Sequence, residues 1–491
     1  MKNSKERNLW NMKKIKLFLD NFIVYGLGGI INKLIPFVMI PIVTRLLPAP
    51  SYYGLNSLFH TMMMFASTFV TFGMYDAMFR FFFEKDETEY KKEICSTAFF
   101  FVSCTSILLF MGMFLLRKVL SKYFFGGEQY SYLVILASIA AIANSVCGML
   151  GAPTRMQNKR RLFLIINICS GVIAYSISLI LLKCKVYESA LPMGSLISAI
   201  IITAVFGIFN YKWFAIKHLK REHLRLLLSV ALPVVPITFI YWVFNSCDKL
   251  MITNMLSIDA AGIYSVGAKF GAISQLIYTA FSGGWQYFAY STMKDEDQMD
   301  VNSRIFECLG IISCVSMIFL CIVIYSIFSI LFEGDYISAY IVAPYLFLAP
   351  LLQMLFQILC SQFTIHGKTW MNMVFLIISV LFNIIANYYL IPLMGIEGAA
   401  LATLMGYFLA LIISMFVSYR MSYFKLNKKF LLCMMALFGY FILWRKLFKT
   451  NMFNSLLMGG IVFILYFAIY KNEIIVLAGR LKESIDRIEK G

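Results

Sequence analysis

The sequence has few charged side chains and few residues of the kinds that bind metals. Only 14% of its 491 residues are Asp, Glu, Lys or Arg, whereas a soluble domain carries about 25%. It has four histidines, and no His-Glu-x-x-His motif or group of His and Cys ligands is present. We therefore expect no metal, no cofactor and no catalytic residues, so the protein is not predicted to be an enzyme.

Eleven cysteines are present, and none forms a Cys-x-x-Cys motif. Most lie within apolar runs, so we interpret them as reduced residues that pack in the interior. Residues 1–20 are polar and basic, and no short apolar core with a cleavage site follows them. We therefore expect no removable signal peptide.

Hydrophobic residues make up 60% of the chain, and the mean hydropathy is +0.78. Apolar runs of about 20 residues recur, which is the length that a helix needs to cross a bilayer. Strands of alternating polarity, as in a membrane barrel, are not found. The sequence predicts an all-α polytopic membrane protein with about 14 transmembrane helices, which begin near residues 21, 53, 93, 130, 161, 187, 224, 260, 303, 338, 369, 396, 428 and 454.

Residues 383–404 indicate how neighbouring spans are connected. One apolar run ends before Pro392, and another begins at Ala399. Pro392 and Gly395 favour a turn between them, and Glu397 suits the first turn of a helix, where the helix dipole is positive. We expect two antiparallel helices joined by about six residues.

Lys and Arg are distributed unevenly between the two sets of loops. Thirty of the 43 lie in the termini and loops on the side of the N-terminus, ten lie on the opposite side, and three lie in or near helix interiors. Positive residues favour the cytoplasmic side, so both termini are predicted to be cytoplasmic. The basic residues occupy separate short loops, which favours contact with anionic membrane lipids and argues against nucleic acid as a partner.

The chain contains an internal repeat. A shift of 209 residues aligns Glu188 with Glu397, a shift of 208 aligns Gly54 with Gly262, and the predicted span starts follow the same register. Each half has an even number of spans, so the repeats are parallel, and transporters of this kind bind substrate between their halves. We predict a basic cytoplasmic N-terminus (1–20), two six-helix bundles (21–212 and 224–420), two additional helices (428–476) and a cytoplasmic tail (477–491).

Three stretches resemble a known family. They are Thr44-Arg45-Leu46-Leu47 to Tyr53-Gly54, Asp248-Lys249-Leu250-Met251-Ile252 to Ala261-Gly262-Ile263-Tyr264-Ser265, and the hairpin at 383–404. Over roughly residues 20–420 the chain is similar to polysaccharide flippases, the O-antigen-type exporters of the multidrug/oligosaccharidyl-lipid/polysaccharide superfamily.

This resemblance implies a multi-pass protein of the bacterial cytoplasmic membrane. Such proteins move undecaprenyl-diphosphate-linked oligosaccharide from the inner to the outer leaflet for O-antigen, capsule or exopolysaccharide assembly. A polymerase of the same pathway is then a candidate partner. The first predicted span lacks the acid of the drug-exporting branch and the Arg/Asp-rich pattern of the lipid II flippase branch, and both absences favour the oligosaccharide branch.

Ionisable residues inside spans mark candidate binding residues, because a charge at the bilayer centre costs roughly 2.5–3.5 kcal/mol. Lys33, beside Asn32, lies midway along the first span, and Lys269 lies in the eighth, opposite His60 under the 209 shift. We predict that these four residues line a cationic cavity that binds a diphosphate headgroup. The alternatives are that Lys33 snorkels or pairs with an acid such as Asp76, and that His60 only satisfies a buried hydrogen bond.

Four other charged residues lie near span ends. Arg45 and Lys249 end the first and seventh spans at the outer face, where they would bind phosphate or anchor the helices at the interface. Asp76 and Arg80 lie four residues apart in the second span, as a gate or coupling pair or as a local ion pair. Prolines fall in the first and seventh spans, which are the spans expected to bend, at Pro36, Pro41, Pro233 and Pro236.

Two other functional classes stay open. One is an ion-coupled exporter of drugs or other small molecules, although a cavity rich in cations disfavours cationic drugs. The other is a polyprenyl-linked glycosyltransferase, polymerase or ligase. Asp295-Glu296-Asp297 has the Asp-x-Asp spacing of metal-bound nucleotide sugars, but it lies in a short loop without a nucleotide-binding domain, which favours a solvated charged run.

The predicted orientation can be tested by thiol labelling. A single cysteine introduced near Lys159, in a background without reactive native cysteines, should be protected from a membrane-impermeant reagent in intact cells. It should react once the membrane is permeabilised. Labelling in intact cells would contradict a cytoplasmic N-terminus.

Overall fold

The computed structural model describes residues 34–293, 295–425 and 427–489. Within them the regular secondary structure is helical, and no strand is present. The chain forms two compact units: the chain up to Val266 with Val380–Ala402, and Gly267–Ser379 with Thr403 to the end. These units are defined by spatial proximity and the repeats by chain order, so the repeat boundaries at 21–212 and 224–420 stay a prediction.

Eleven helices in the described part of the chain are long and apolar enough to cross a membrane. The chain is therefore an all-helical, polytopic membrane protein, as the sequence predicts. Three of the 14 predicted spans do not reach this standard: the described part of the first is a short helix (Leu34–Leu46), the second is α2 (Pro50–Thr71), and the eighth is divided between α10 (Ile258–Gly271) and α11 (Ser274–Ser291).

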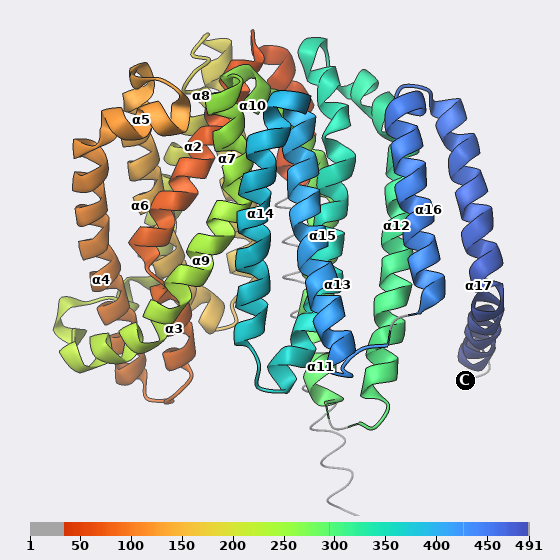
Figure 1. Cartoon of the computed structure of the whole chain (residues 1–491). Coiled ribbons are helices and arrows are strands. Elements are labelled where there is room, and N and C mark those ends of the chain that lie inside the picture. The colour runs from red at the N-terminus through yellow and green to blue at the C-terminus, as the bar shows by residue number, and fades with distance from the viewer. Residues whose placement is uncertain (1–33, 294, 426, 490–491) are drawn as a thin grey trace, which may run out of the picture. The chain divides into compact units, whose positions relative to one another are not determined.

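The first unit is a helical bundle built mainly from the N-terminal part of the chain (Figure 1). After Leu34–Leu46 and α2 its helices are α3 (Met74–Phe82), α4 (Thr88–Leu115), α5 (Arg117–Phe125), η1 (Glu128–Tyr130), α6 (Ser131–Met156), α7 (Arg160–Lys183), α8 (Ala190–Asn210), η2 (Tyr211–Trp213), η3 (Ile216–His218), α9 (Arg221–Met255) and the start of α10. Helices α2, α4, α6, α7, α8, α9 and α10 begin within about five residues of predicted span starts.

The predicted second span is broken into α2 and α3. Phe72 and Gly73 between them both have left-handed backbone, with φ of 50° and 71°. Glycine is required at position 73 for a second reason, because an added Cβ would lie 2.6 Å from the carbonyl oxygen of Ala231 in α9. The short α3 therefore packs closely on α9 as a separate helix.

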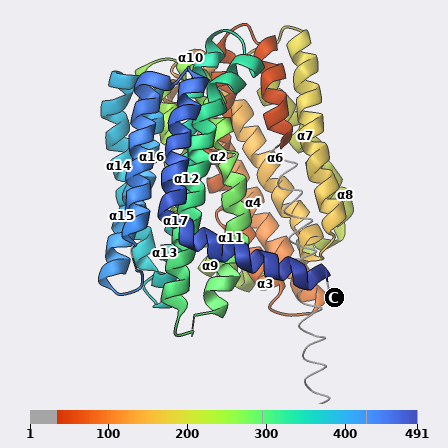
Figure 2. The ribbon, with the colours of Figure 1, turned by 90° about the vertical axis from the view of Figure 1, so that its right-hand side faces the viewer.

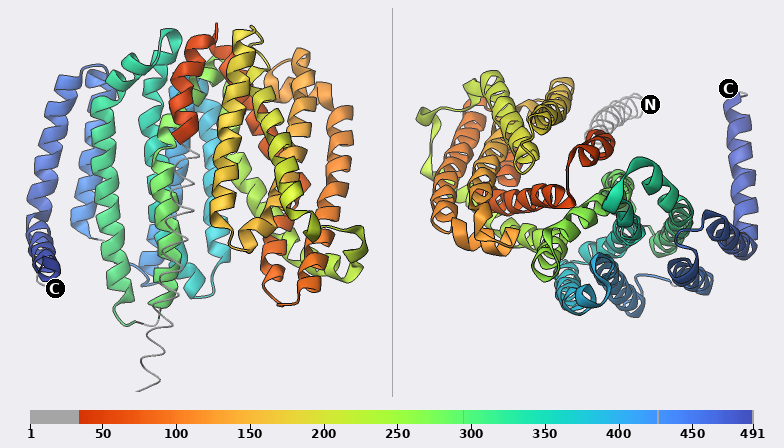
Figure 3. Two further views of the ribbon diagram at one scale, coloured as in Figure 1. Left: turned by 180° about the vertical axis from the view of Figure 1, so that it is seen from behind. Right: turned by 90° about the horizontal axis from the view of Figure 1, so that it is seen from above.

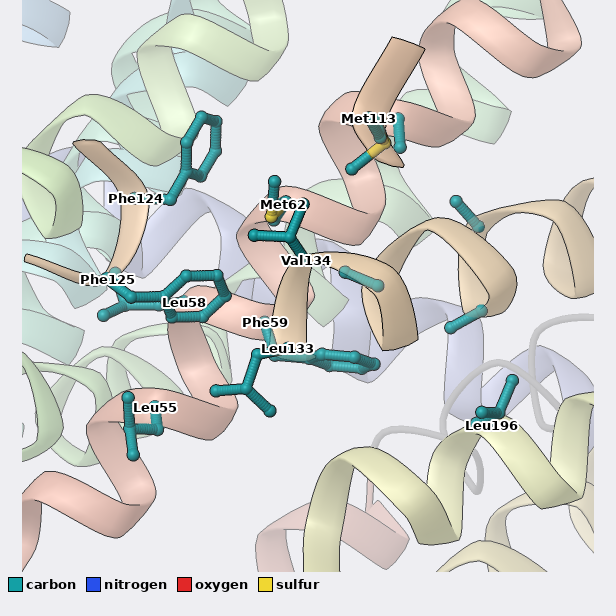
Figure 4. Close-up of a cluster of buried hydrophobic side chains, with 14 of the residues drawn as sticks. Leu55, Leu58, Phe59, Met62, Met113, Phe124, Phe125, Leu133, Val134 and Leu196 are labelled. Carbon is teal, nitrogen blue, oxygen red and sulfur yellow. The ribbon is translucent and has the colours of Figure 1, made fainter. Parts of the chain in front are cut away.

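The core of the first unit lies where α2 meets α5 and α6 (Figure 4). Leu58, Phe59 and Met62 of α2 are fully buried against Phe125 of α5 and Leu133 of α6. Their spacing of three and four residues places them along one face of the helix. This face is covered by protein rather than by lipid.

Helices α6, α7 and α8 pack side by side, as the orange and yellow ribbons of Figure 3 show. Small residues allow α7 and α8 to approach closely: a Cβ on Gly194 would lie 2.5 Å from the carbonyl oxygen of Ala174. The hydroxyls of Ser170 and Ser198 lie 3.2 Å apart across the same interface. Close backbones and shared hydroxyls are how helices associate in lipid.

The second unit contains the end of α10 and most of the C-terminal helices. They are α11, α12 (Gln298–Leu331), η4 (Gly334–Ile341), α13 (Ala343–Ile365), α14 (Trp370–Met394), α15 (Ile396–Arg420), α16 (Lys428–Leu443), η5 (Trp444–Phe448) and α17 (Met452–Glu489). The first unit includes the end of α14 and the start of α15.

The two C-terminal helices, α16 and α17, pack on α12. A Cβ on Gly310 of α12 would lie 2.3 Å from the ring of Phe430, so the ring fills the space that glycine leaves. The Trp444 Nε1 donates to the Cys321 carbonyl at 2.8 Å. Helix α17 has non-helical backbone at Tyr470 (φ −108°, ψ 15°), and Figure 2 shows the helix changing direction along its length.

The hairpin between α14 and α15 differs from the prediction. Pro392 lies inside α14 and not in the turn, and Gly395 alone separates α14 from α15. Gly395 makes this possible with a φ of +62°, and its N–H donates to the Ile391 carbonyl at 2.8 Å. Glu397 lies in the first turn of α15, as expected.

The prolines predicted to bend two spans lie inside helices in the described chain. Pro233 and Pro236 are in the interior of α9, whose ribbon bends along its length in Figure 1. Proline removes a backbone hydrogen bond at such positions, which accounts for the bend. A role of these bends in transport stays a prediction.

Candidate functional site

Helices α2 and α10 cross at two glycines in the first unit. A Cβ on Gly54 would lie 2.3 Å from the Ile258 carbonyl oxygen, and a Cβ on Gly262 would lie 2.1 Å from the Pro50 carbonyl oxygen. The contact is symmetric, because both pairs are exchanged by the 208-residue shift found in the sequence. Side chains larger than hydrogen at either position would force the two backbones apart. We call this contact the α2–α10 seam.

Hydrogen bonds extend the seam along both helices with the same symmetry. The Ser265 hydroxyl donates to the Ser57 hydroxyl at 2.8 Å, and these residues are 208 positions apart. The Ser51 N–H donates to an oxygen of Asp259 at 2.7 Å, across the same separation. The seam is at the end of the first unit that holds the start of α2, whereas α3 lies at the opposite end (Figure 1).

Lys269 lies on the same face of α10 as the seam residues. It follows Gly262 by seven positions and Ser265 by four, which is one helical face. Among the described residues Lys269 has no hydrogen-bond or ion-pair partner, and its side chain is exposed. This predicted binding residue is therefore available to a ligand.

The opposite face of α10 is packed tightly within the second unit. A Cβ on Gly267 would lie 2.6 Å from the Ala339 carbonyl oxygen, and a Cβ on Gly271 would lie 2.6 Å from Leu346 Cβ. The Phe270 ring makes a tilted contact with that of Phe328 at 4.6 Å and an edge-on contact with that of Phe332 at 5.7 Å between ring centroids. Because α10 is held on this side, Lys269 is carried on a rigid support.

The structure also places three other predicted binding residues, which are His60, Arg45 and Lys249. His60 is half-buried on α2, with its ring 5.6 Å from that of Phe59 in an edge-on contact. It belongs to the first unit, whereas Lys269 belongs to the second. Arg45 is exposed near the end of Leu34–Leu46, and Lys249 is half-buried. Lys249 does not end its helix, because α9 continues to Met255. Lys33 and Asn32 lie outside the described residues.

The predicted gate pair, Asp76 and Arg80, lies on α3. Both side chains are exposed, and the described ion pairs do not include one between them. The Arg80 guanidinium instead lies over the ring of Phe81, 5.4 Å from its centroid. The local ion pair considered as an alternative is thus not formed, and a gating role stays a prediction.

A buried polar network centred on Asp248 is a feature that the sequence reasoning missed. Asp248 is 5% exposed, and its carboxylate accepts hydrogen bonds at 2.7 Å from the Tyr264 hydroxyl and from the Asn387 amide. The Cys247 thiol donates to the Asn383 side-chain oxygen at 3.0 Å. The network joins α9, α10 and α14 within the first unit. Asn383 and Asn387, four residues apart in an apolar run, were the signal in the sequence.

One acceptor in this network has no donor. The side-chain oxygen of Asn387 is buried and has no hydrogen-bond partner among the described residues, whereas the nitrogen of the same amide donates to Asp248. Carboxylate and carboxamide oxygens are common ligands of hard cations. Among the described residues, this network included, no three His, Cys, Asp or Glu side chains are grouped so that they could hold a metal ion.

The chain has the fold of solved transporters of the MOP superfamily. The chain is similar to the lipid II flippase MurJ in an inward closed conformation, with a TM-score of 0.68 and 14% identity over 92% of this chain and 100% of that one. It is also similar to an inward-facing multidrug resistance MATE family transporter of the MOP superfamily, with a TM-score of 0.57 and 15% identity over 80% and 98%.

A third similar structure is a MOP superfamily transporter from Pyrococcus furiosus, described as having a binding pocket of reverse polarity. Its TM-score is 0.53, with 12% identity over 82% of this chain and 95% of that one. The family model described as polysaccharide biosynthesis protein matches residues 42–341. The chain therefore belongs to the polysaccharide biosynthesis protein family. No curated protein sequence matches it.

The closeness of the seam can be tested by disulfide formation. Ser57→Cys together with Ser265→Cys should crosslink in high yield on mild oxidation, because the two hydroxyl oxygens lie 2.8 Å apart. Adding Gly262→Ala should lower the yield severalfold, since the new methyl group would meet the Pro50 carbonyl. Mass spectrometry of the linked peptides measures the yield.

The matched control for this experiment is Gly148→Ala in α6, where an added Cβ meets no atom within 4 Å. It should leave the crosslinking yield unchanged. Equal yields from the Gly148 and Gly262 variants would show that the two helices do not depend on glycine for their contact.

The Asp248 network should contribute to stability. Asp248→Ala leaves the Tyr264 hydroxyl and the Asn387 amide without their acceptor, which costs about 2–5 kcal/mol in the free energy of unfolding. Asp248→Asn keeps an acceptor and should cost less. The exposed Asp76→Ala is the control and should change stability by no more than about 0.5 kcal/mol. Thermal unfolding in detergent gives the comparison, and equal midpoints for the two alanine variants would refute the contribution.

Proposed function

We propose that this protein is a flippase that moves undecaprenyl-diphosphate-linked oligosaccharide across the bacterial cytoplasmic membrane, with both termini in the cytoplasm. The observation that carries the proposal is Lys269, an exposed lysine without a protein partner in the described chain of a transporter that belongs to the polysaccharide biosynthesis protein family. The partner expected for this function is a polymerase of the same pathway.

Physical chemistry supports an anionic substrate. A sugar diphosphate cannot enter hydrocarbon without losing the water around its charges and hydroxyls. A lysine is a mobile point charge with three donors, which can follow a phosphate while the protein changes shape. In the proposed mechanism Lys33 and Lys269 replace part of the lost hydration, and the polyprenyl tail stays in lipid. Arg45 and Lys249 receive or release the headgroup near the predicted outer face.

In the proposed transport cycle, the seam closes one end of the substrate path. Helices α2 and α10 are in backbone contact through Gly54 and Gly262, so a headgroup cannot pass between them there. In the proposed cycle this contact parts when the substrate leaves on the predicted outer side. The mechanism needs no covalent chemistry, which agrees with the transporter fold.

A second candidate is an ion-coupled exporter of small molecules. It is favoured by the buried Asp248 and by the unpaired acceptor of Asn387 beside it. Intramembrane carboxylates often serve as sites for coupling ions. The two candidates differ in substrate, because an exporter of this kind would move a soluble compound and not a lipid-linked sugar.

The deciding experiment is transport of a lipid-linked oligosaccharide in proteoliposomes. Lys33→Ala and Lys269→Ala should insert normally but raise the apparent KM about tenfold or more, because a charge-assisted contact contributes about 1.5–3 kcal/mol. Lys33→Arg and Lys269→Arg should keep part of the activity. Lys122→Ala, which removes an exposed lysine of α5, is the control and should transport normally. Wild-type transport by both neutral variants would overturn the cationic site, and export of small molecules alone would favour the second candidate.

A further inference from the structure

A short motif at the start of α4 holds the segment that follows α8. Ser96, which is 4% exposed, accepts a hydrogen bond from the Ala215 N–H at 3.1 Å and donates to the Trp213 carbonyl at 3.2 Å. Three residues later on α4, the Phe99 ring lies 5.1 Å from that of Phe214. Three residues earlier, Glu93 forms an ion pair with Lys220 at 2.6 Å.

A similar arrangement occurs in the second unit, near the start of α12, although the Ser303 hydroxyl donates to the Met299 carbonyl of its own helix. Ser303, which is 8% exposed, accepts a hydrogen bond from the Lys425 N–H at 3.0 Å. Three residues later, the Phe306 ring lies 4.8 Å from that of Phe424. Three residues earlier, Asp300 forms an ion pair with the Lys425 ammonium at 2.5 Å.

The two sites share their pattern in sequence as well as in space. Both helices carry acid-x-x-Ser-x-x-Phe, as residues 93–99 and 300–306, and both linkers carry two successive aromatic residues before the N–H that the serine binds. Under the repeat, α4 and α12 are the third helices of the two halves, and the linkers follow the sixth helices, α8 and α15. Helix capping alone does not explain why both halves carry this helix motif and this linker motif at equivalent places.

Additional contacts make each attachment stronger than a single hydrogen bond. In the first unit the Thr97 hydroxyl accepts from the Lys220 N–H at 3.3 Å, and Glu93 also contacts the His223 ring nitrogen at 2.9 Å. The hydrogen bond to Glu93 raises the pKa of the Lys220 amine. In the second unit the Asn427 amide donates to Glu307 at 2.7 Å.

We propose that these two motifs are equivalent anchors, which bind the chain after each sixth helix to the third helix of the same half and stay closed throughout transport. Ser96 and Ser303 are then positioning residues. The first anchor makes the start of α9 part of the first bundle, and the second makes α16 and α17 part of the second. Only the statement that the anchors stay closed throughout transport rests on the proposed function.

Hydrogen–deuterium exchange tests the anchors without any substrate. Ser96→Ala should speed exchange about three- to tenfold in residues 213–220, and Ser303→Ala should do so in residues 423–427, because each variant removes the acceptor of a linker N–H. Ser103→Ala and Ser313→Ala are matched controls, since these hydroxyls bond only to carbonyls of their own helices. Ser96→Thr and Ser303→Thr should restore slow exchange. Unchanged exchange in the alanine variants would overturn the anchors.

Crosslinking then tests whether the anchors open during transport. Ser96→Cys with Ala215→Cys, and Ser303→Cys with Lys425→Cys, should form disulfides on oxidation and still transport within about twofold of the reduced proteins. The crosslink across the α2–α10 seam should stop transport in the same assay. Arrest by either anchor disulfide, reversed by reduction, would overturn the claim that the anchors stay closed. Absence of transport in the parent protein would refute the proposed function and leave the exchange result to decide on the anchors.

Discussion

The absence of water from the bilayer core is the constraint on which this structure depends. A backbone or side-chain polar group in hydrocarbon needs a partner from the protein, and helices have no hydrophobic drive to leave lipid for one another. The α2–α10 seam meets both demands, because Gly54 and Gly262 let two backbones touch and two serine hydroxyls bond to each other. The carboxylate of Asp248 meets the same demand with the Tyr264 hydroxyl and the Asn387 amide.

The same constraint explains why the unpaired charge of Lys269 is notable. Most polar groups near the seam are matched by protein, whereas this ammonium has no described partner and is exposed. An unpaired charge within a membrane is retained at a cost, which a ligand of opposite charge would offset. The fold is shared with solved transporters, and the chain belongs to the polysaccharide biosynthesis protein family. In the proposed function, an anionic, lipid-linked sugar would be that ligand.

The two ends of the first unit differ in how they are held. At one end, α2 and α10 touch at Gly54 and Gly262 and share hydrogen bonds at Ser51 and Ser57. At the other, α4 holds the linker by an ion pair, backbone hydrogen bonds and an aromatic contact. A transporter that alternates between two states needs contacts of both kinds. In the proposed cycle the seam parts and the anchors persist, and the anchor motif occurs in both halves of the internal repeat.

The sequence by itself determined the helical membrane class, the approximate starts of the helices and the 208-residue symmetry that reappears in the seam, because span length, hydropathy and repeat spacing are local or periodic properties. It misjudged Pro392, which is inside α14, and the break at Phe72 and Gly73, because a helix can absorb a proline near its end and a turn needs only one or two left-handed residues. It did not reveal the Asp248 network or the anchors. Those depend on which helices become neighbours, and burial of one polar group against another is decided only when distant segments pack together.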